Sequence, residues 1–423
     1  MGVSWAPMSD ATNTFHGRPF HVMVKPIGPA CNLDCRYCFY LEKARLFDGE
    51  QSPRINDEVL ESFVRQYIAA LPDAPEINFA WQGGEPTLMG LDFFRKVVAL
   101  QQKYSGGKKI TNAFQTNATL LDDEWCAFLA ANQFLTGVSL DGPHELHDAY
   151  RRDKRGRSTF DVVVAAVARL KQHGAPFNTL TVVNRVNSKQ PLKVYRFLKE
   201  IGSTFHQFIP IVERVANPAA QALGLPLATP PSASAAEDTA VTEWSVLPED
   251  YGRFLITIFD DWIRQDVGRI FVQLFDAALA AWVGQSGTVC VYAEECGNAI
   301  ILEHNGEIYA CDHFVYPEYL LGNLKDTPLT ELAWSAQQQK FGRDKKTLLP
   351  PYCRQCEYLF ACNGECPKHR FAKTPDGEPG LSYLCAGLKR FFQHATPKLD
   401  AMARLVQAGF PAADIMKRVQ ASG

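Results

Sequence analysis

The residues best suited to chemistry in this chain are its cysteines. The 423 residues include twelve, and all but Cys126 lie in closely spaced groups. Three form a Cys-x3-Cys-x2-Cys group at Cys31, Cys35 and Cys38. Eight more are Cys290, Cys296, Cys311, Cys353, Cys356, Cys362, Cys366 and Cys385. In a reducing compartment, thiols grouped in this way are more often ligands of a metal or a cluster than disulfide partners.

The first group offers three ligands, which leaves a coordination shell incomplete. Structural zinc is held by four ligands, whereas a [4Fe-4S] cube bound by three thiolates keeps one iron open for a chelating small molecule. A zinc knuckle that borrows a distant fourth ligand is the alternative that the spacing allows. Cys126, next to Trp125 and near Phe128, is expected to be a core thiol without a chemical role.

The first group, in the segment KPIGPACNLDCRYCFY, resembles the radical S-adenosylmethionine (SAM) superfamily. Tyr37 takes the place of the aromatic residue before the third cysteine. Gly83-Gly84-Glu85-Pro86 is similar to that superfamily's GGEP segment, where backbone polar groups hold the methionine amino group. The resemblance implies SAM contacts from Tyr37, Gly84, Ser139, Arg151 and Val212.

The eight later cysteines, from Cys290 to Cys385, form what we call the second cysteine field. Their spacing resembles the SPASM extension of radical SAM enzymes, and the sulfatase-maturating type in particular. The resemblance implies two auxiliary [4Fe-4S] clusters, which makes three clusters in all, and an electron conduit. The first auxiliary ligand set would be Cys290, Cys296, Cys311 and Cys366, and the second would be Cys353, Cys356, Cys362 and Cys385. A double zinc ribbon is the alternative for these eight thiols.

Asp312 directly follows the implied ligand Cys311. An Asp in a turn commonly caps backbone, but a carboxylate beside a cluster can also act as a base. Sulfatase-maturating enzymes carry their general base immediately after this cysteine, and Tyr40, Gln82 and Gln115 match positions that line their substrate side. The implied reaction oxidises a peptidyl Cys or Ser, in a Cys/Ser-x-Pro-x-Arg motif of a sulfatase, to Cα-formylglycine.

The resemblance also implies partners: an unfolded or nascent sulfatase polypeptide and an external electron donor such as flavodoxin or ferredoxin. One alternative is a SPASM peptide maturase acting on a ribosomal natural-product precursor. Such enzymes commonly carry an N-terminal recognition domain, for which the residues before Cys31 are too few. A second alternative is a non-catalytic Fe-S or zinc scaffold protein. It would leave unexplained the polar motifs at the expected strand ends, which are GGEP at 83–86, QTN at 115–117 and SLDG at 139–142.

These residues need a scaffold, and the pattern before residue 216 predicts alternating strands and helices. The expected strands are His21–Lys25, Glu76–Trp81, Ile110–Gln115, Leu135–Leu140, Phe177–Val183 and Thr204–Ile211. The expected helices are Asn56–Leu71, Leu91–Tyr104, Asp122–Asn132, Thr159–His173 and Leu192–Ile201. They indicate an α/β fold with a parallel sheet, either open or a partial barrel, and the resemblance favours a partial (βα)6 barrel. In both, chemistry lies beyond the carboxyl ends of the strands.

The chain is expected to divide into six parts. These are an N-terminal tail (1–20), the radical SAM partial barrel (21–215), a variable loop (216–247), connecting helices (248–285), a Cys-rich SPASM subdomain (286–390) and a C-terminal helical segment (391–423). Residues 216–242 are rich in Ala, Pro and Ser, which predicts a mobile loop. Helices are expected at Pro248–Gln265, Phe275–Val283 and Phe391–Gln420.

Composition excludes several functions. The formal net charge of −3 and a charged fraction of 21% give no basic field for nucleic acid, and RRDKRGR at 151–157 is too short to change this. No apolar run approaches the roughly 20 residues of a membrane span. The first residues lack a signal peptide and a myristoylation site. We therefore expect a cytoplasmic protein with neither nucleic-acid nor membrane partners.

Overall fold

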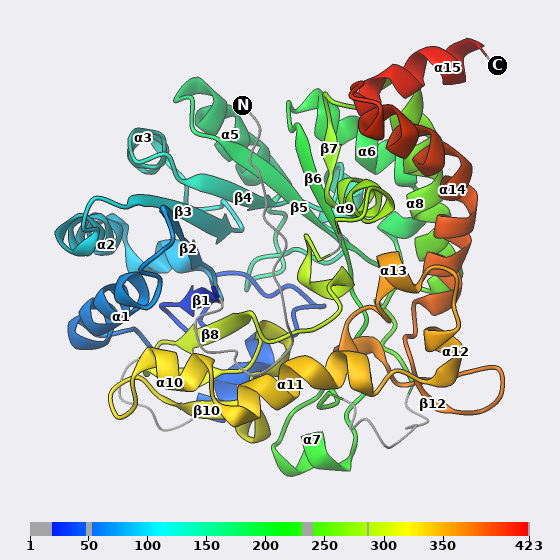
Figure 1. Ribbon diagram of the computed structural model, residues 1–423. Helices are drawn as coiled ribbons and strands as arrows, with labels where there is room; N and C mark the ends of the chain where they lie inside the picture. Colours follow the sequence, from blue (N-terminus) through cyan, green and yellow to red (C-terminus); the bar gives the residue numbers. More distant parts are fainter. Residues whose placement is uncertain (1–18, 48–52, 231–239, 286, 422–423) are drawn as a thin grey trace.

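The computed structural model describes residues 19–47, 53–230, 240–285 and 287–421 (Figure 1). Most of the expected N-terminal tail, and residues 231–239 of the expected loop, lie outside this range. The centre of the molecule is one ten-stranded sheet in the order β10-β9-β8-β1-β2-β3-β4-β5-β6-β7. Helices cover the outer face of the strands from β1 to β7, residues 299–347 lie along the lower side in Figure 1, and residues 385–421 run up its right side.

The strands from β1 to β7 pair in parallel with their neighbours. They are β1 (His21–Lys25), β2 (Glu76–Trp81), β3 (Lys109–Thr116), β4 (Leu135–Ser139), β5 (Phe177–Val183), β6 (Phe205–Pro210) and β7 (Phe271–Val272). The crossover helices are α1 (Asp57–Ala70), α2 (Leu91–Tyr104), α3 (Asp123–Ala131), α4 (His144–His147), α5 (Phe160–Gln172) and α6 (Pro191–Glu200). The expected α/β architecture is confirmed, and each of the six expected strands agrees with its observed bounds to within one residue.

Local sequence explains why these elements form. Asn56 caps α1, since its side chain accepts a hydrogen bond from the Val59 N–H at 2.9 Å. Below the cap, Phe63 is fully buried and its ring packs edge-on against Phe79 of β2, with centroids 5.6 Å apart. Burying such a side chain contributes roughly 1.5–3 kcal/mol. The buried apolar residues along one side of α1 therefore hold the helix against the sheet. The ends of the strands stay free for the site.

The Cys-rich region also joins the central sheet, which the sequence reading did not predict. β8 (Ala299–Glu303) pairs in parallel with β1 over its whole length, and β9 (Glu307–Tyr309) and β10 (Leu320–Asn323) continue antiparallel. Its remaining elements are α10 (Leu329–Ala333), α11 (Ala336–Thr347), α12 (Pro351–Arg354), α13 (Leu359–Cys362), β11 (Ala372–Lys373) and β12 (Pro379–Leu381). The strands of the Cys-rich region and the strand that leads into the first cysteine group therefore belong to one continuous sheet.

Two expectations about the connecting segments are wrong in detail. The described part of 216–242 contains a helix, α7 (Pro218–Ala222), capped by Asn217, and antiparallel bridges join Arg214 to Val241 and Val215 to Leu227. The single helix expected at Phe391–Gln420 is two helices, α14 (Cys385–Gln407) and α15 (Ile415–Ala421). Gly409, with φ +81°, and Pro411 stand between them, because a left-handed glycine ends a helix and proline cannot continue it.

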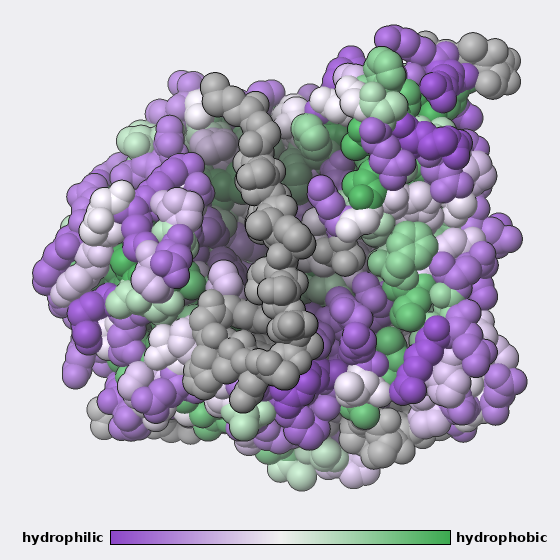
Figure 2. All heavy atoms as spheres, viewed as in Figure 1, coloured by the Kyte–Doolittle hydropathy of each residue, from purple (hydrophilic) through white to green (hydrophobic). Residues whose placement is uncertain are grey.

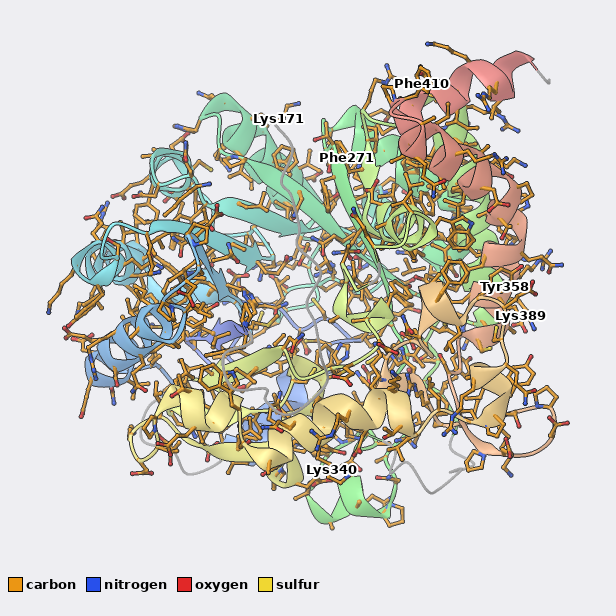
Figure 3. All side chains as sticks on the ribbon, in the orientation of Figure 1. Lys171, Phe271, Lys340, Tyr358, Lys389 and Phe410 are labelled. Carbon is orange, nitrogen blue, oxygen red and sulfur yellow. The ribbon has the colours of Figure 1, made fainter. Side chains whose placement is uncertain are left out.

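The connecting helices α8 (Pro248–Gln265) and α9 (Gln273–Trp282) link the sheet to α14, which packs along α8. Phe259 of α8 and Phe391 of α14 meet edge-on, with ring centroids 5.8 Å apart. In the view of Figure 2 polar residues predominate on the surface, with small hydrophobic groups over α14 and α15. Phe410, labelled in Figure 3, belongs to the latter region and is 57% exposed. Within the described residues, no helix has the length and apolarity needed to cross a bilayer.

Candidate active site

The loop after β1 carries Cys31, Cys35 and Cys38, and side chains from the end of β3 hold it in place. Asn117 donates from Nδ2 to Asn32 Oδ1 at 2.9 Å and lies 3.8 Å from Cys31 Sγ. Asn32 in turn donates to Thr119 Oγ1 at 2.8 Å. Three of the expected ligands thus lie on one loop that is anchored to the carboxyl end of β3, and the carboxyl ends of the strands are where a parallel sheet places its chemistry.

The donor set of this loop fits an iron-sulfur cluster. Burial raises the pKa of Cys31 to about 11 and also raises the pKa values of Cys35 and Cys38, so the bare thiols hold their protons until iron displaces them. Among the described residues, no three His, Cys, Asp or Glu side chains converge on a point where one metal ion could bind. Three thiols on one loop match the donor set of a [4Fe-4S] cube that keeps one iron open.

Gly84 lies directly against the cysteine loop. A Cβ at this position would overlap the carbonyl oxygen of Ala30, the residue before Cys31. The Gly84 N–H donates to Gly28 O at 2.8 Å, and the Glu85 N–H donates to Ala30 O at 3.0 Å. Only glycine permits this approach of two backbones, so the GGEP segment and the cysteine loop form one cradle.

Glu85 fastens that cradle to β3, a role that the sequence reading did not assign to it. Its carboxylate is fully buried and accepts hydrogen bonds from the Asn117 N–H (2.8 Å), Thr116 Oγ1 (2.8 Å), Thr87 Oγ1 (2.6 Å) and the Thr87 N–H (3.0 Å). Burial raises the pKa of Glu85, and the four hydrogen bonds oppose that rise. The only sequence signal was its place inside the GGEP segment.

Asp141 is a second buried carboxylate that the sequence reading quoted but gave no role. It is fully buried, accepts a hydrogen bond from the Tyr37 hydroxyl and lies 3.0 Å from Arg151 Nε. Its other oxygen accepts from the Val182 N–H at 2.9 Å. The guanidinium carbon of Arg151 is 5.4 Å from the centroid of the Tyr37 ring. Two expected SAM contacts are therefore held together by one carboxylate at the end of β4.

Three of the other expected SAM and substrate residues, Gln82, Gln115 and Ser139, lie at the carboxyl ends of β2, β3 and β4. Gln115 donates from Nε2 to Ser139 Oγ at 3.0 Å, in space that Gly137 leaves open. The amide oxygen of Gln82 is buried and has no hydrogen-bond partner among the described residues, as expected of a group that faces a ligand. Val212 is 2% exposed and belongs to the main hydrophobic core, so its expected adenine contact remains a prediction.

Asp312 forms an ion pair with Lys25, the last residue of β1. Lys25 is 2% exposed, and its Nζ lies 3.8 Å from the centroid of the Tyr40 ring. The Tyr40 hydroxyl donates to the fully buried Glu303 of β8. Burial raises the pKa of Asp312, but the positive charge of Lys25, its hydrogen bond and smaller contributions from other neighbours together outweigh burial and lower the pKa below its ordinary value. The expected base is thus kept ionised beside the cysteine loop.

The eight remaining cysteines lie in two groups. Burial raises the pKa of Cys311, and the nearby Cys366, Cys296 and Cys290 raise it further. Burial likewise raises the pKa of Cys385 to about 11, with contributions from Cys353 and Cys356, and Cys385 and Cys353 act in the same way on Cys362. The four cysteines of each group are the four of one expected ligand set. Their binding of a cluster remains a prediction.

Buried cations fix the chain around these groups. Lys345 is 1% exposed and donates to the carbonyl oxygens of Cys290 (2.8 Å) and Val291 (3.0 Å). Arg370 donates to the carbonyls of Gly364 (2.8 Å), Asn363 (2.8 Å), Glu365 (3.1 Å) and Lys345. The second group lies toward the periphery, near Tyr358 and Lys389 (Figure 3). Neither cation was identified from the sequence.

A cavity of about 290 Å³ opens beside Cys38. Arg36, Cys38 and Glu42 line it from the cysteine loop and its continuation, and Leu227 and Trp244 line it from the segments after β6. It therefore gives access from solvent to the neighbourhood of the first cysteine group.

Comparison with known families agrees with this geometry. Residues 26–198 match the model of the radical SAM superfamily, and residues 290–357 match SPASM, an iron-sulfur cluster-binding domain. The cysteine loop, its GGEP cradle and the second cysteine field are therefore those of a radical SAM enzyme with a SPASM extension.

The chain is 46% identical over 413 residues, 98% of each chain, to the serine-type anaerobic sulfatase-maturating enzyme of Bacteroides thetaiotaomicron. It belongs to the anaerobic sulfatase-maturating enzymes. The cysteine-type enzyme of Clostridium perfringens is 33% identical over 92% of this chain and 100% of its own. Membership of this family excludes the non-catalytic scaffold as an account of the protein.

Solved structures give the same result. The structure of anSMEcpe with bound AdoMet and the Cp18Cys peptide is 32% identical to this chain, covers 92% of it and 100% of its own, and superimposes with a TM-score of 0.79. Streptococcus suis SuiB bound to the precursor peptide SuiA is 16% identical, with a TM-score of 0.57 over 86% of this chain and 75% of its own, and shares the fold alone.

Proposed function

We propose that this enzyme oxidises Cβ of a serine or cysteine in the Cys/Ser-x-Pro-x-Arg motif of a sulfatase polypeptide, giving Cα-formylglycine. Serine is the favoured residue, because the relative with 46% identity is of the serine type and the relative with 33% identity is of the cysteine type. The acceptor is an unfolded or nascent sulfatase, and the electron donor is a flavodoxin or ferredoxin in the cytoplasm.

The cofactors in this proposal are SAM and three [4Fe-4S] clusters. Cys31, Cys35 and Cys38 hold the first, and the two groups of four cysteines hold the auxiliary pair. When bound, these groups supply the one-electron chemistry that removes a hydrogen atom and an electron from Cβ. Tyr37, Gly84, Ser139, Arg151 and Val212 orient SAM, and the close approach of Gly84 to the backbone of Ala30 supports this by bringing the GGEP segment against the cysteine loop.

The chain itself handles the proton. Converting a hydroxymethyl group to an aldehyde releases one proton besides the hydrogen atom and the electron, and Asp312 accepts it from the substrate hydroxyl or thiol. With cysteine the same losses give a thioaldehyde, which water hydrolyses to the aldehyde with release of hydrogen sulfide. Tyr40, Gln82 and Gln115 line the substrate side. The observation that carries the proposal is the Asp312–Lys25 ion pair, because it keeps a carboxylate ionised at the end of the strand that leads into the cysteine loop.

The test is an anaerobic reaction of the reconstituted enzyme with SAM, a reductant and a serine or cysteine peptide, recording peptide mass and 5′-deoxyadenosine together. We expect aldehyde formation coupled to 5′-deoxyadenosine, faster with the serine peptide. Asp312→Asn should slow aldehyde formation by a factor of about 10²–10⁴. Asp326→Asn, at an exposed turn, is the matched control and should react normally. An unchanged rate in Asp312→Asn would remove Asp312 as the base, and 5′-deoxyadenosine with an unaltered peptide would reject the substrate.

A further inference from the structure

His313 contacts both the cysteine loop and a thiol of the first auxiliary group. Its Nδ1 lies 3.5 Å from Cys366 Sγ, within hydrogen-bond range for sulfur. Its ring meets the Phe39 ring edge-on, with centroids 5.4 Å apart and an angle of 81° between the planes. Phe39 directly follows Cys38 in the sequence. One imidazole therefore joins the first cysteine group to the first auxiliary group.

The position of the ring is fixed from several sides. The next residue, Phe314, is buried and packs edge-on against Phe341, with centroids 5.0 Å apart. Lys368 also contacts Phe39, with Nζ 4.3 Å from the ring centroid, and forms an ion pair with Glu213. Because its neighbours are anchored, the imidazole has little freedom to turn away from Cys366.

The chemistry of the contact follows from the state of the thiol. A cysteine that ligates iron is a thiolate without a proton, so the hydrogen bond requires Nδ1–H of His313 to donate and Cys366 Sγ to accept. A hydrogen bond to a ligand sulfur stabilises the reduced, more negative cluster more than the oxidised one, and so raises its reduction potential.

The second auxiliary group has no equivalent. Within the described residues, His313 is the only side chain that donates a hydrogen bond to an auxiliary cysteine sulfur, whereas Cys362 of the second group receives a hydrogen bond from the backbone of Gly364. The effect of His313 is therefore confined to one of the two groups.

We propose that His313 raises the reduction potential of the first auxiliary cluster through the Nδ1–H···Sγ hydrogen bond to Cys366. The inference rests on the proposed function, in which Cys366 is a cluster ligand. Oxidation of the substrate releases one electron, and a higher potential makes this cluster a better acceptor of it. The substrate is oxidised and the cluster is reduced by one electron, while the proton goes to Asp312.

The experiment is a redox titration of the anaerobically reconstituted full-length enzyme, followed by electron paramagnetic resonance. In His313→Phe the midpoint potential of one auxiliary cluster should fall while the other clusters keep theirs. His313→Gln, which retains an N–H donor, should restore part of the shift. Phe39→Leu removes the ring contact but leaves the hydrogen bond, so it is the matched control and should leave the auxiliary midpoints unchanged.

Different results would reject the role of His313 and the cofactor set. If His313→Phe keeps the full iron content and the wild-type midpoints, or if it loses one cluster altogether, the proposal for His313 is rejected. Wild-type enzyme that binds only the iron and sulfide of one cluster would instead refute the cofactor set on which it rests.

Discussion

The two halves of the active centre bury charge in opposite ways. At the strand ends the buried charges that hold backbone N–H groups are carboxylates, Glu85 and Asp141, which accept hydrogen bonds from Asn117 N–H and Val182 N–H among others. Around the auxiliary cysteines the buried charges that anchor the backbone are cations, Lys345 and Arg370, which donate to backbone carbonyls. The sign of the buried charge thus follows the kind of backbone group that is left unpaired.

The difference has a physical origin. Where parallel strands end, the chain turns out of the sheet and leaves N–H groups without ladder partners, which call for acceptors. Around the cysteines the chain runs through consecutive left-handed residues, Asn363 (φ 48°), Gly364 (φ 69°) and Glu365 (φ 56°), whose carbonyls all receive bonds from Arg370. Irregular backbone of this kind calls for a donor with several N–H groups, which arginine supplies.

The largest effect is expected from Arg370→Met. The substitution leaves four buried carbonyl oxygens without their donor, and losing such a buried charged partner should cost roughly 3–5 kcal/mol. We expect a clear fall in the urea midpoint and in bound iron. Arg354→Met is the matched control, because Arg354 is exposed and donates only to Thr347 O at 2.9 Å. Equal stability of the two variants would contradict the role given to buried cations.

Asp141→Asn tests the carboxylate half with a smaller expected effect. The amide keeps the shape of the side chain but loses the negative charge that holds Arg151 and Tyr37. The dissociation constant for SAM, measured by equilibrium dialysis, should rise by roughly 10- to 100-fold, which corresponds to about 1.4–2.7 kcal/mol. Asp153→Asn alters an exposed ion pair with Arg157 and should leave the dissociation constant unchanged. Unaltered SAM binding in Asp141→Asn would show that Arg151 needs no carboxylate to hold it.

The smallest effect concerns Asp276 on α9, a carboxylate that lacks the full set of donors found at Glu85. Burial raises the pKa of Asp276 from 3.8 to about 7, and its Oδ2 has no hydrogen-bond partner among the described residues. The folded state therefore binds this proton more tightly than the unfolded state, so stability falls as the pH rises from about 4 to about 7.

Asp276→Asn removes that dependence. Relative to the wild type, the variant should gain about 1 kcal/mol or more in unfolding free energy between about pH 5 and about pH 8. Anaerobic urea unfolding at both pH values measures the difference. A constant difference between the two proteins across this range would mean that Asp276 is ionised throughout in the folded state.

How far the sequence predicts the site differs between the two halves as well. The strands before residue 216 alternate with amphipathic helices, so their bounds and the polar residues at their ends could be read directly. The strands β8 to β10 were not predicted. The first of them contains the apolar run at 299–302, but a run this short does not distinguish a strand from a buried turn of helix. Lys345 and Arg370 carried no signal, since a charged residue in a sequence is ordinarily on the surface and only tertiary structure buries it.

Charged residues next to recognised motifs were also underestimated. Glu85 and Asp141 lie in the segments that contain Gly84 and Ser139, the residues expected to contact SAM. Lys25 is the last residue of a strand whose length was predicted correctly. Their contacts run to Asn117, Arg151 and Asp312, which are distant in the chain. Pairings of this kind are set by the sheet order, which the spacing of motifs does not specify.

The position of β8 beside β1 has a consequence for how the protein is made. Among the described strands β1 is synthesised first, yet β8, which covers its outer edge, does not begin until residue 299. Until β8 arrives, β1 presents a row of unpaired backbone groups, which is a template for pairing with another chain. A growing or truncated chain that ends before residue 299 should therefore tend to aggregate. The pairing of β8 with β1 would then protect this edge of the sheet from pairing with another chain.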